Sequence, residues 1–489
     1  MSKAIVIGSG IAGLASALRL RSKGYEVKVF EANAYTGGKI HAFSNKGYRF
    51  DFGPSLFTMP HLVDELFELF DKDPKKHFKY IRKDIICNYF WEDGHTFTAP
   101  SDKKQFIEQA AKSFWVEERT LENYLNRNKE KYDLTAGLFL EKSLHKLYTY
   151  LSPDTLKSLL RIGKLHLNNT LNGVNQSYFN DSKLVQLFNR YATYNGSSPY
   201  RTPGIMSLIP HLEMHYGTYF PTKGMHDISQ SLYRLAEQVG IEFYLEEPVM
   251  SITTQKHEVT GVKTKRDTYE ADVAISNMDV FSTYQTLLPD SRQPKRILKQ
   301  ERSSSAVIFY WGINRQFGEL DLHNIFFSNN YWQEFEHIFN KRDLYRDPTV
   351  YINITSKDKP DDAPPGCENW FVMINAPGNV GQNWDEIVDE ARRNIILKLN
   401  RVLKTRIEDL IVTEDVVDPR TIESKTRSHQ GSLYGTSSNS KFAAFLRHPN
   451  FSSQYKNLYF CGGSVHPGGG IPLCLLSAKI VSDQIPAND

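Results

Sequence analysis

The first 31 residues of the chain contain a strand, a glycine-rich turn, a helix and a second strand. Residues 4–7 (AIVI) are apolar and mostly β-branched, which is typical of a buried parallel strand. A helix is predicted from about Ala12 to Lys23, and the second strand ends at Glu31. The turn between the first strand and the helix is GSGIAG, residues 8–13. This βαβ order restricts the N-terminal part of the chain to a sheet with a dinucleotide site at its edge.

The spacing of the three glycines in this turn has a physical reason. Gly8 permits the tight turn, Gly10 lets a pyrophosphate approach the backbone, and Gly13 lets the helix pack closely on the strand. The helix N-terminus adds unpaired N–H groups and a partial positive charge. Glu31, 18 residues after Gly13, can accept both ribose hydroxyl groups and disfavours a 2′-phosphate, so NADP is not expected. FAD and NAD both remain open on these residues.

Two further glycine-rich segments favour FAD. Residues 34–39 (AYTGGK) place a glycine pair and a cation just after the second strand, where they can wrap the same pyrophosphate; a surface turn is the alternative. Residues 461–472 (CGGSVHPGGGIP) place five glycines at the start of a C-terminal helix. A helix N-terminus aimed at an isoalloxazine ring stabilises the reduced, anionic flavin. A simple NAD dehydrogenase has no need of this second loop, although a structural turn would also explain it.

The remaining pattern predicts a mixed architecture. Residues 101–130, 140–167 and 384–403 have helical spacing, and residues 242–277 resemble a meander of short strands. A strand, a glycine-rich turn and a helix recur over 457–485. We therefore expect helices and sheets from distant parts of the chain to surround the dinucleotide unit.

Composition excludes several classes of protein. The 59 basic and 56 acidic side chains give a net charge of +3, which argues against a nucleic-acid binder. The four cysteines form no C-x-x-C pair, so neither a zinc site nor a disulfide framework is indicated, and no metal is expected. The N-terminus lacks signal-peptide features, and no apolar run approaches the ~18 residues of a transmembrane helix. Reduced thiols in a cytosolic protein are the simplest interpretation.

Motifs along essentially the whole chain resemble those of bacterial-type carotenoid desaturases, the phytoene desaturase family of flavin amine-oxidase-like enzymes. The first and last motifs occur in many flavoproteins, whereas the internal ones are specific. They are VIGSGIAGLASALRL (6–20), EANAYTGGK (31–39), GYRFDFGPSLFTMP (47–60), RYATYNGSSPYRTP (190–203), FPTKGM (220–225), VIFYWGI (307–313), ENWFVMINAP (368–377) and NLYFCGGSVHPGGGIPLCLLSAK (457–479).

The resemblance implies FAD as the redox cofactor and an α/β (mixed α+β) fold. It implies a Rossmann-like FAD-binding domain of the two-dinucleotide-binding-domain flavoprotein type, a β-sheet substrate domain and a helical lid or membrane-binding domain. The expected FAD-binding domain comprises residues 1–71, 222–282 and 450–489. The expected substrate domain comprises 72–100 and 283–449, and the helical domain comprises 101–221.

Within this family, GPSLFTMP and CGGSVHPGGGIP look most like the subgroup that acts on carotenoid ends. Ser464 and Val465 stand where phytoene desaturases more usually have Gly-Thr. The subgroup implies 3,4-desaturation of a 1-hydroxylated carotenoid, acyclic or monocyclic (γ-carotene-type). The alternative is a phytoene desaturase that makes lycopene. More distant alternatives are a flavin amine oxidase or monooxygenase and a non-catalytic prenyl-binding protein.

The resemblance also assigns roles to individual residues. The expected cofactor-binding residues are Gly8, Ser9, Gly10, Ile11, Ala12, Gly13, Glu31, Ala32, Gly38, Lys39, Gly53, Pro54, Ser55, Val249, Gly462, Gly463, Gly470 and Ile471. Within this set, the 53–55 loop is expected near the flavin ring, and Val249 is expected to present its backbone to the adenine from the first strand of the meander. Catalytic candidates are His466, which can also be a packing residue beside Pro467, and Ser55, which can bond a substrate hydroxyl or cap a turn.

The expected reaction needs few catalytic side chains. A flavin takes one hydrogen as hydride at its N5 atom, and the second leaves as a proton, so positioning supplies much of the rate. Oxygen and a membrane quinone are both reasonable electron acceptors. The sequence does not choose between them.

The size of the expected substrate implies contact with a membrane. Burying a ~40-carbon polyene from water would contribute ~30 kcal/mol, above the practical affinity limit near ~20 kcal/mol. Transfer from a bilayer into an apolar channel avoids this discrepancy. Residues 138–167 combine recurring apolar positions with basic ones, which suits docking on anionic lipid at the inner face of the cell membrane. An ordinary amphipathic helix pair on the protein surface is the alternative.

Overall fold

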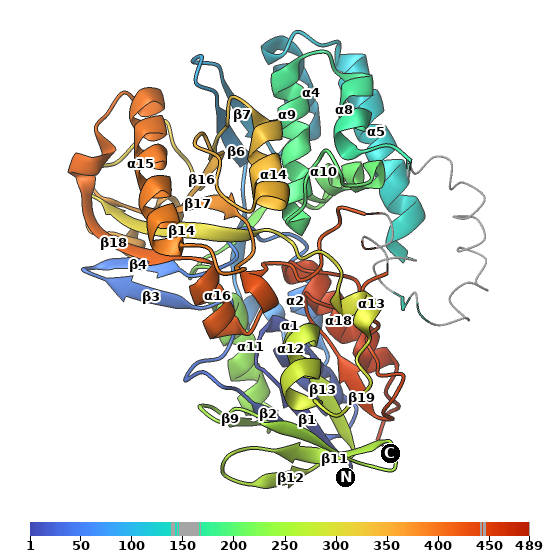
Figure 1. Ribbon diagram of the computed structural model, residues 1–489. Helices are drawn as coiled ribbons and strands as arrows, with labels where there is room; N and C mark the ends of the chain where they lie inside the picture. The colour runs from blue at the N-terminus through green and yellow to red at the C-terminus, as the bar shows by residue number, and fades with distance from the viewer. Residues whose placement is uncertain are drawn as a thin grey trace.

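Two large sheets and a group of helices make up the protein (Figure 1). The computed structural model describes residues 1–137, 142, 143, 145, 166, 168–440, 443 and 446–488. The two chain termini lie close together beside the lower, parallel sheet, and the helices α4, α5, α8 and α9 lie at the opposite end. The predicted mixed α/β class with a Rossmann-like unit is confirmed.

The lower sheet has five parallel strands in the order β19-β13-β1-β2-β9. The strands are β1 (Lys3–Ile7), β2 (Glu26–Phe30), β9 (Glu242–Tyr244), β13 (Val273–Ser276) and β19 (Leu458–Phe460). On one face, apolar side chains of β1 and β2 pack under α1 (Ile11–Ser22), α11 (His226–Gln238) and α18 (Ile471–Asp483). α1 is apolar around most of its surface because neighbouring elements enclose it on all sides.

The opposite face of this sheet is covered by a small antiparallel meander. Ile5 and Ile7 of β1 point toward it, as the alternation along a strand requires. The meander consists of β10 (Ser251–Gln255), β11 (Glu258–Lys263) and β12 (Thr268–Glu270). The prediction of one meander over 242–277 was therefore wrong at both ends, because β9 and β13 join the parallel sheet. A short buried strand carries no local signal of its partner.

The upper sheet has seven strands in the order β18-β14-β17-β16-β15-β6-β7, antiparallel except for the β15–β6 pair. Its strands are β6 (Ile85–Phe90), β7 (Thr96–Pro100), β14 (Ser305–Ile313), β15 (His323–Phe326), β16 (Val350–Ile354), β17 (Glu368–Ala376) and β18 (Ile411–Val417). One face packs under α15 (Trp384–Leu403) through residues such as Trp311, Trp370 and Ile352. The other face turns toward the hairpin of β3 (Ala42–Asn45) and β4 (Tyr48–Asp51).

The helical end contains α4 (Lys103–Ser113), α5 (Glu118–Thr135), α8 (Leu171–Tyr178) and α9 (Ser182–Asn189). Three of these helices begin at side chains that cap them: Asp102, Thr170 and Asp181 each accept a bond from a backbone N–H. The predicted docking segment, 138–167, lies outside the described residues except for 142, 143, 145 and 166. Within the described ranges, no helix is long and apolar enough to cross a membrane.

Shorter elements connect these layers. They are α2 (His61–Glu68), α3 (Pro74–His77), β5 (Tyr80–Arg82), α10 (Ile209–His211), β8 (Tyr219–Pro221), α12 (Val280–Ser282), α13 (Lys295–Leu298), α14 (Tyr331–Glu336) and α16 (Pro419–Thr426). β5 and β8 pair with each other beside α2 and the Phe57 loop.

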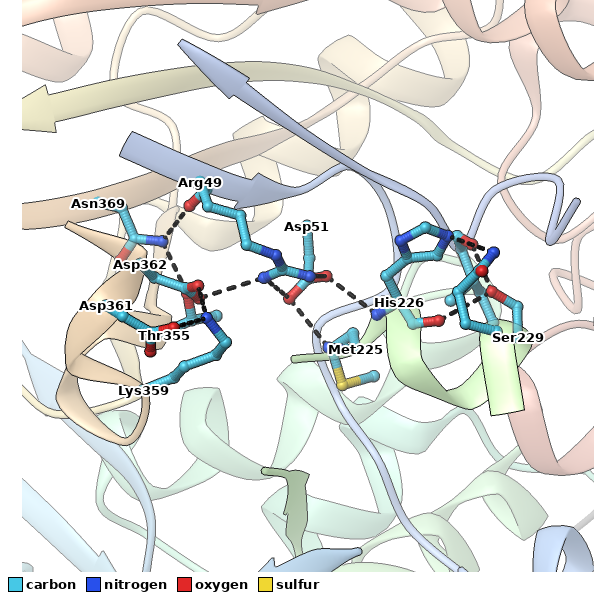
Figure 2. Close-up of polar contacts among 12 residues, drawn as sticks. Arg49, Asp51, Met225, His226, Ser229, Thr355, Lys359, Asp361, Asp362 and Asn369 are labelled. Atoms are coloured by element: carbon cyan, nitrogen blue, oxygen red, sulfur yellow. Dashed lines mark hydrogen bonds and ion pairs between the residues drawn. The ribbon is translucent and has the colours of Figure 1, made fainter. Parts of the chain in front are cut away.

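A buried polar cluster joins the two sheets (Figure 2). Arg49 of β4 pairs with Asp51 at 2.8 Å and with the fully buried Asp362 at 3.2 Å. The Asp51 carboxylate also accepts bonds from the backbone N–H groups of Met225 and His226, where α11 begins. One arginine therefore connects the helix layer of the parallel sheet with the loops of the seven-stranded sheet.

Candidate functional site

Three parallel strands end side by side, and the predicted glycine loops follow two of them. Gly8 comes after β1, Gly462 comes after β19, and Asn277 comes after β13, which lies between these strands. Asn277 donates a bond from Nδ2 to the Gly8 carbonyl at 3.3 Å. A Cβ atom on Gly462 would lie 2.8 Å from Asn277 Oδ1, and one on Gly10 would lie 2.7 Å from its Nδ2. The glycine loops from the two ends of the chain therefore meet at Asn277.

The first glycine loop has no room for a side chain at Gly13. A Cβ atom on Gly13 would lie 2.1 Å from the Gly8 carbonyl oxygen, so α1 packs against the turn as closely as the motif predicts. Gly8 has φ +92°, which favours glycine. Gly10 is the N-cap of α1 and provides no side chain, so the first N–H groups of this helix have no side-chain cap. Such a helix end can bind a pyrophosphate.

The second glycine loop lies directly against the first. Gly37 donates a backbone bond to Ser9 at 2.9 Å, and a Cβ atom on Gly38 would lie 3.2 Å from Gly10 Cα. The 53–55 loop packs in turn on Lys39, because a Cβ atom on Gly53 would lie 2.0 Å from the Lys39 carbonyl oxygen. The structure thus places the three N-terminal loops of the predicted site in contact.

Glu31 directly follows β2, which ends one residue earlier than predicted, and its carboxylate is buried. One oxygen accepts from Ser9 N at 2.8 Å and Ser9 Oγ at 2.7 Å, and the other accepts from Asn33 N at 2.9 Å and Asn33 Nδ2 at 2.8 Å. A ribose hydroxyl group can take the place of either side-chain donor. Val249 lies just before β10 and not within a strand, which corrects the expected position.

The C-terminal loop supplies a second uncapped helix end. Gly470 is the N-cap of α18 and has φ +104°, with no side-chain cap. Gly469 packs on the backbone of Tyr434, since a Cβ atom there would lie 2.8 Å from Tyr434 Cα. Arg447 donates to the carbonyl oxygens of Tyr434 at 2.9 Å and Gly463 at 3.3 Å. The backbone at Tyr434 and the Arg447 side chain therefore hold the C-terminal glycine loop in place.

Two cations lie among these loops, Arg447 fully buried and Lys39 half-buried. Lys39 donates from Nζ to the Leu433 carbonyl at 3.0 Å, and burial lowers the pKa of its ammonium group. Burial also lowers the pKa of Arg447 to about 10. A bound anion would stabilise both charges, because burial without a counter-charge disfavours them. The cations, the uncapped ends of α1 and α18 and the space left by the glycines together fit FAD.

Sequence reasoning missed Asn277, Tyr434 and Arg447. Asn277 follows a strand that the sequence alone assigned to the meander, so its position gave no usable signal. Arg447 is recognisable only by its burial, which is a property of the tertiary structure.

The two catalytic candidates differ in their surroundings. His466 is 2% exposed, its Nε2 atom lies 2.9 Å from the Lys142 carbonyl oxygen, and burial lowers its pKa to about 4. These features are typical of a structural histidine, so a catalytic role for His466 stays a prediction. The Oγ atom of Ser55 lies 2.8 Å from the Tyr351 hydroxyl, which belongs to the upper sheet. Ser55 is half-buried and therefore remains accessible.

The fold and these loops are those of a flavoprotein, and the loops from the two ends of the chain offer a site that fits its cofactor. Residues 11–486 match the family of flavin containing amine oxidoreductases, and the chain belongs to this family. It is a FAD-dependent oxidoreductase, as the glycine loops predicted.

Relatives agree with this assignment along the whole chain. The sequence is 60% identical to a 1-hydroxycarotenoid 3,4-desaturase from Flavobacterium sp. (strain P99-3), over 99% of both chains. It is 31% identical to a 4,4'-diapolycopene oxygenase from Methylomonas sp, over 99% of this chain and 98% of the relative. The resemblance to carotenoid desaturases is thereby confirmed.

Solved structures show the same fold at low sequence identity. An oxidoreductase from Methanosarcina mazei superposes with a TM-score of 0.66 at 15% identity, covering 98% of this chain and 100% of that one. Putrescine oxidase bound to putrescine superposes with a TM-score of 0.64 at 15% identity, covering 99% and 98%.

Proposed function

We propose that the protein introduces the C3–C4 double bond into a 1-hydroxylated carotenoid, acyclic or monocyclic, during carotenoid biosynthesis. The observation that carries this proposal is the 60% identity, from end to end, to a 1-hydroxycarotenoid 3,4-desaturase. The contact between the glycine loops of the two chain ends, described above, supports the flavin part of the proposal. The domain boundaries given above, with a substrate domain and a helical lid, belong to the same proposal.

The residues of the chain have several tasks in this reaction. When bound, FAD supplies a hydride acceptor at its N5 atom. The loops at Gly10, Gly38 and Gly53 provide close backbone contact, while the uncapped end of α18 offers N–H groups and partial positive charge to the ring. Lys39 adds a half-buried cation, whose ammonium pKa is lowered by burial. The second hydrogen leaves as a proton, for which His466 is the candidate acceptor, while Ser55 is the candidate for bonding a substrate hydroxyl group.

A carotenoid substrate would come from a membrane, for the reason of burial energy given above. We assign docking to residues 138–167, whose basic side chains Lys142, Lys146, Lys157, Arg161 and Lys164 suit anionic lipid at the inner face of the cell membrane. A quinone in the same bilayer, or oxygen, would then reoxidise the flavin.

Flotation with phosphatidylglycerol vesicles tests this docking: K157Q/R161Q/K164Q is expected to lower binding by roughly 100-fold, at ~1 kcal/mol per charge. K104Q/K112Q/R119Q, on α4 and α5, is the control that keeps binding.

Anaerobic flavin reduction tests the function itself. The purified protein is expected to be yellow and to bleach on addition of a 1-hydroxylated acyclic carotenoid in detergent, with a product that carries a new C3–C4 double bond. Conversion of phytoene to lycopene would replace the proposal with the phytoene desaturase alternative. Bleaching by primary amines alone, or insertion of oxygen into the carotenoid, would overturn it.

A further inference from the structure

One face of the seven-stranded sheet carries an unusual run of polar side chains. The register pairs Tyr351 of β16 with Ile325 of β15, and Asn353 with His323. Their neighbour Ile352 points the other way and is fully buried among residues that pack under α15. Tyr351 and His323 therefore lie on the face that turns toward the β3–β4 hairpin and the 53–55 loop.

Two of these side chains, Tyr351 and His323, form a continuous hydrogen-bonded chain with Ser55 of the 53–55 loop. Ser55 Oγ lies 2.8 Å from the Tyr351 hydroxyl, and that hydroxyl lies 2.8 Å from His323 Nδ1. His323 is 4% exposed, and its Nε2 atom has no hydrogen-bond partner among the residues that the structure describes. The surroundings include aromatic rings, with the Phe371 ring 6.2 Å from that of Tyr351, and also the cations Lys83 and Arg190. Such a polar chain is costly to bury, so a structural role alone explains it poorly.

All three members of this serine–tyrosine–histidine chain are neutral. Burial, together with the positive charges of Lys83 and Arg190, lowers the pKa of His323 to about 3. Burial also raises the pKa of Tyr351. A neutral chain of donors and acceptors suits a neutral hydroxyl group, whereas an ionic ligand would need a counter-charge. The same neutrality makes His323 a weak base for removing a proton from carbon.

The position of Ser55 relates this chain to the flavin. Its loop packs on Lys39, which belongs to the second glycine loop of the cofactor site. Apolar burial is non-directional, so a long polyene in an apolar channel has no preferred register along its length. One hydrogen bond at a fixed point supplies that register. In a 1-hydroxylated carotenoid the oxygen is bound to C1, only two bonds from C3.

We propose that Ser55 and Tyr351 bind the hydroxyl group of the substrate, that His323 orients the Tyr351 hydroxyl, and that this contact selects the C3–C4 bond for oxidation. The inference rests on the proposed function. Ser55 and Tyr351 are then specificity-determining residues and His323 is a positioning residue. None of the three has to gain or lose a proton for this role.

The test compares two substrates that differ only in the hydroxyl group. Anaerobic flavin reduction is measured with a 1-hydroxylated carotenoid and with the same carotenoid lacking the hydroxyl, and kcat/KM is expressed as a ratio of the two. The wild-type ratio is expected to be large, because a site built for a hydroxyl group rejects an analogue without it. Tyr351→Phe and Ser55→Ala are each expected to lower this ratio by roughly 10-fold or more.

A matched control and a rescue variant separate recognition from folding. Tyr459→Phe, on β19, removes a phenolic hydroxyl far from the serine–tyrosine–histidine chain and should leave the ratio of kcat/KM values unchanged. His323→Gln can still bond to Tyr351, so it should lower the ratio less than His323→Leu does, while both retain FAD. An equal loss on both substrates, or an unchanged ratio in Tyr351→Phe and Ser55→Ala, would overturn the inference. If the wild type reduced its flavin with neither carotenoid, the proposed function would fall as well.

Discussion

The two sheets of this protein present their functional groups in different ways. The parallel sheet uses the ends of its strands, where the backbone of the Gly8 and Gly462 loops meets at the Asn277 side chain. The seven-stranded sheet uses a face, on which Tyr351 and His323 stand among apolar neighbours. Backbone groups and helix ends can bind any dinucleotide, because every chain has them. Side chains on a face are specific to one sequence and can therefore distinguish one substrate from another.

This difference predicts unequal sensitivity to mutation. The cofactor site depends on the absence of side chains at a few positions, so adding a single methyl group there should be severe. The substrate face depends on particular polar atoms, so removing one should change selectivity more than stability. The Arg49 cluster connects the two regions and should fall between these extremes (Figure 2).

The largest effect is expected for Gly13→Ala. The added Cβ atom would lie 2.1 Å from the Gly8 carbonyl oxygen, which is backbone and cannot move away alone. We expect a loss of stability of about 3 kcal/mol and loss of bound FAD, measured by thermal unfolding and visible absorption. Gly318→Ala is the control, because no atom lies within 4 Å of its Cβ position. A yellow and stable Gly13→Ala variant would contradict the close packing of this loop.

An intermediate effect is expected for Arg49→Met. The change leaves the fully buried Asp362 carboxylate with Lys359 and Thr355 as its remaining partners. Because Lys359 still neutralises part of the charge, we expect a loss of about 2 kcal/mol in urea unfolding, below the usual cost of breaking a buried pair. Lys129→Met, which breaks the exposed pair with Asp133 on α5, should change stability by less than ~1 kcal/mol. Equal effects of the two variants would show that the cluster does not join the sheets.

The smallest effect concerns the pH dependence of stability. Folded His323 has a pKa of about 3, while the unfolded chain takes up a proton near pH 6.5, so stability falls as pH falls through 6.5. His323→Gln removes this contribution, and the variant should regain about 1 kcal/mol relative to the wild type between pH 7 and pH 5.5. Tyr351→Phe should instead change the free energy of unfolding by the same amount at every pH. Parallel wild-type and His323→Gln profiles, from urea unfolding at each pH, would refute this.

Much of the cofactor site was predictable, because its signals are local. The GSGIAG turn, Glu31 and the C-terminal glycine loop each follow a strand and precede or accompany a helix, so their roles follow from spacing. The error over 242–277 arose because the residues of a strand do not specify which strand it pairs with. β9 and β13 resemble strands of a meander in sequence, and only their tertiary partners place them in the parallel sheet.

The sequence by itself determined the class of the protein, a flavoprotein with glycine loops at both ends of the chain, since glycine spacing acts over a few residues of backbone. Only the tertiary structure decided that these loops meet at Asn277 and that Ser55, Tyr351 and His323 form one chain. The contacts of Asn277 with Gly8 and of Ser55 with Tyr351 join residues more than 250 positions apart. Sheet pairing and burial create them, and both depend on the whole fold.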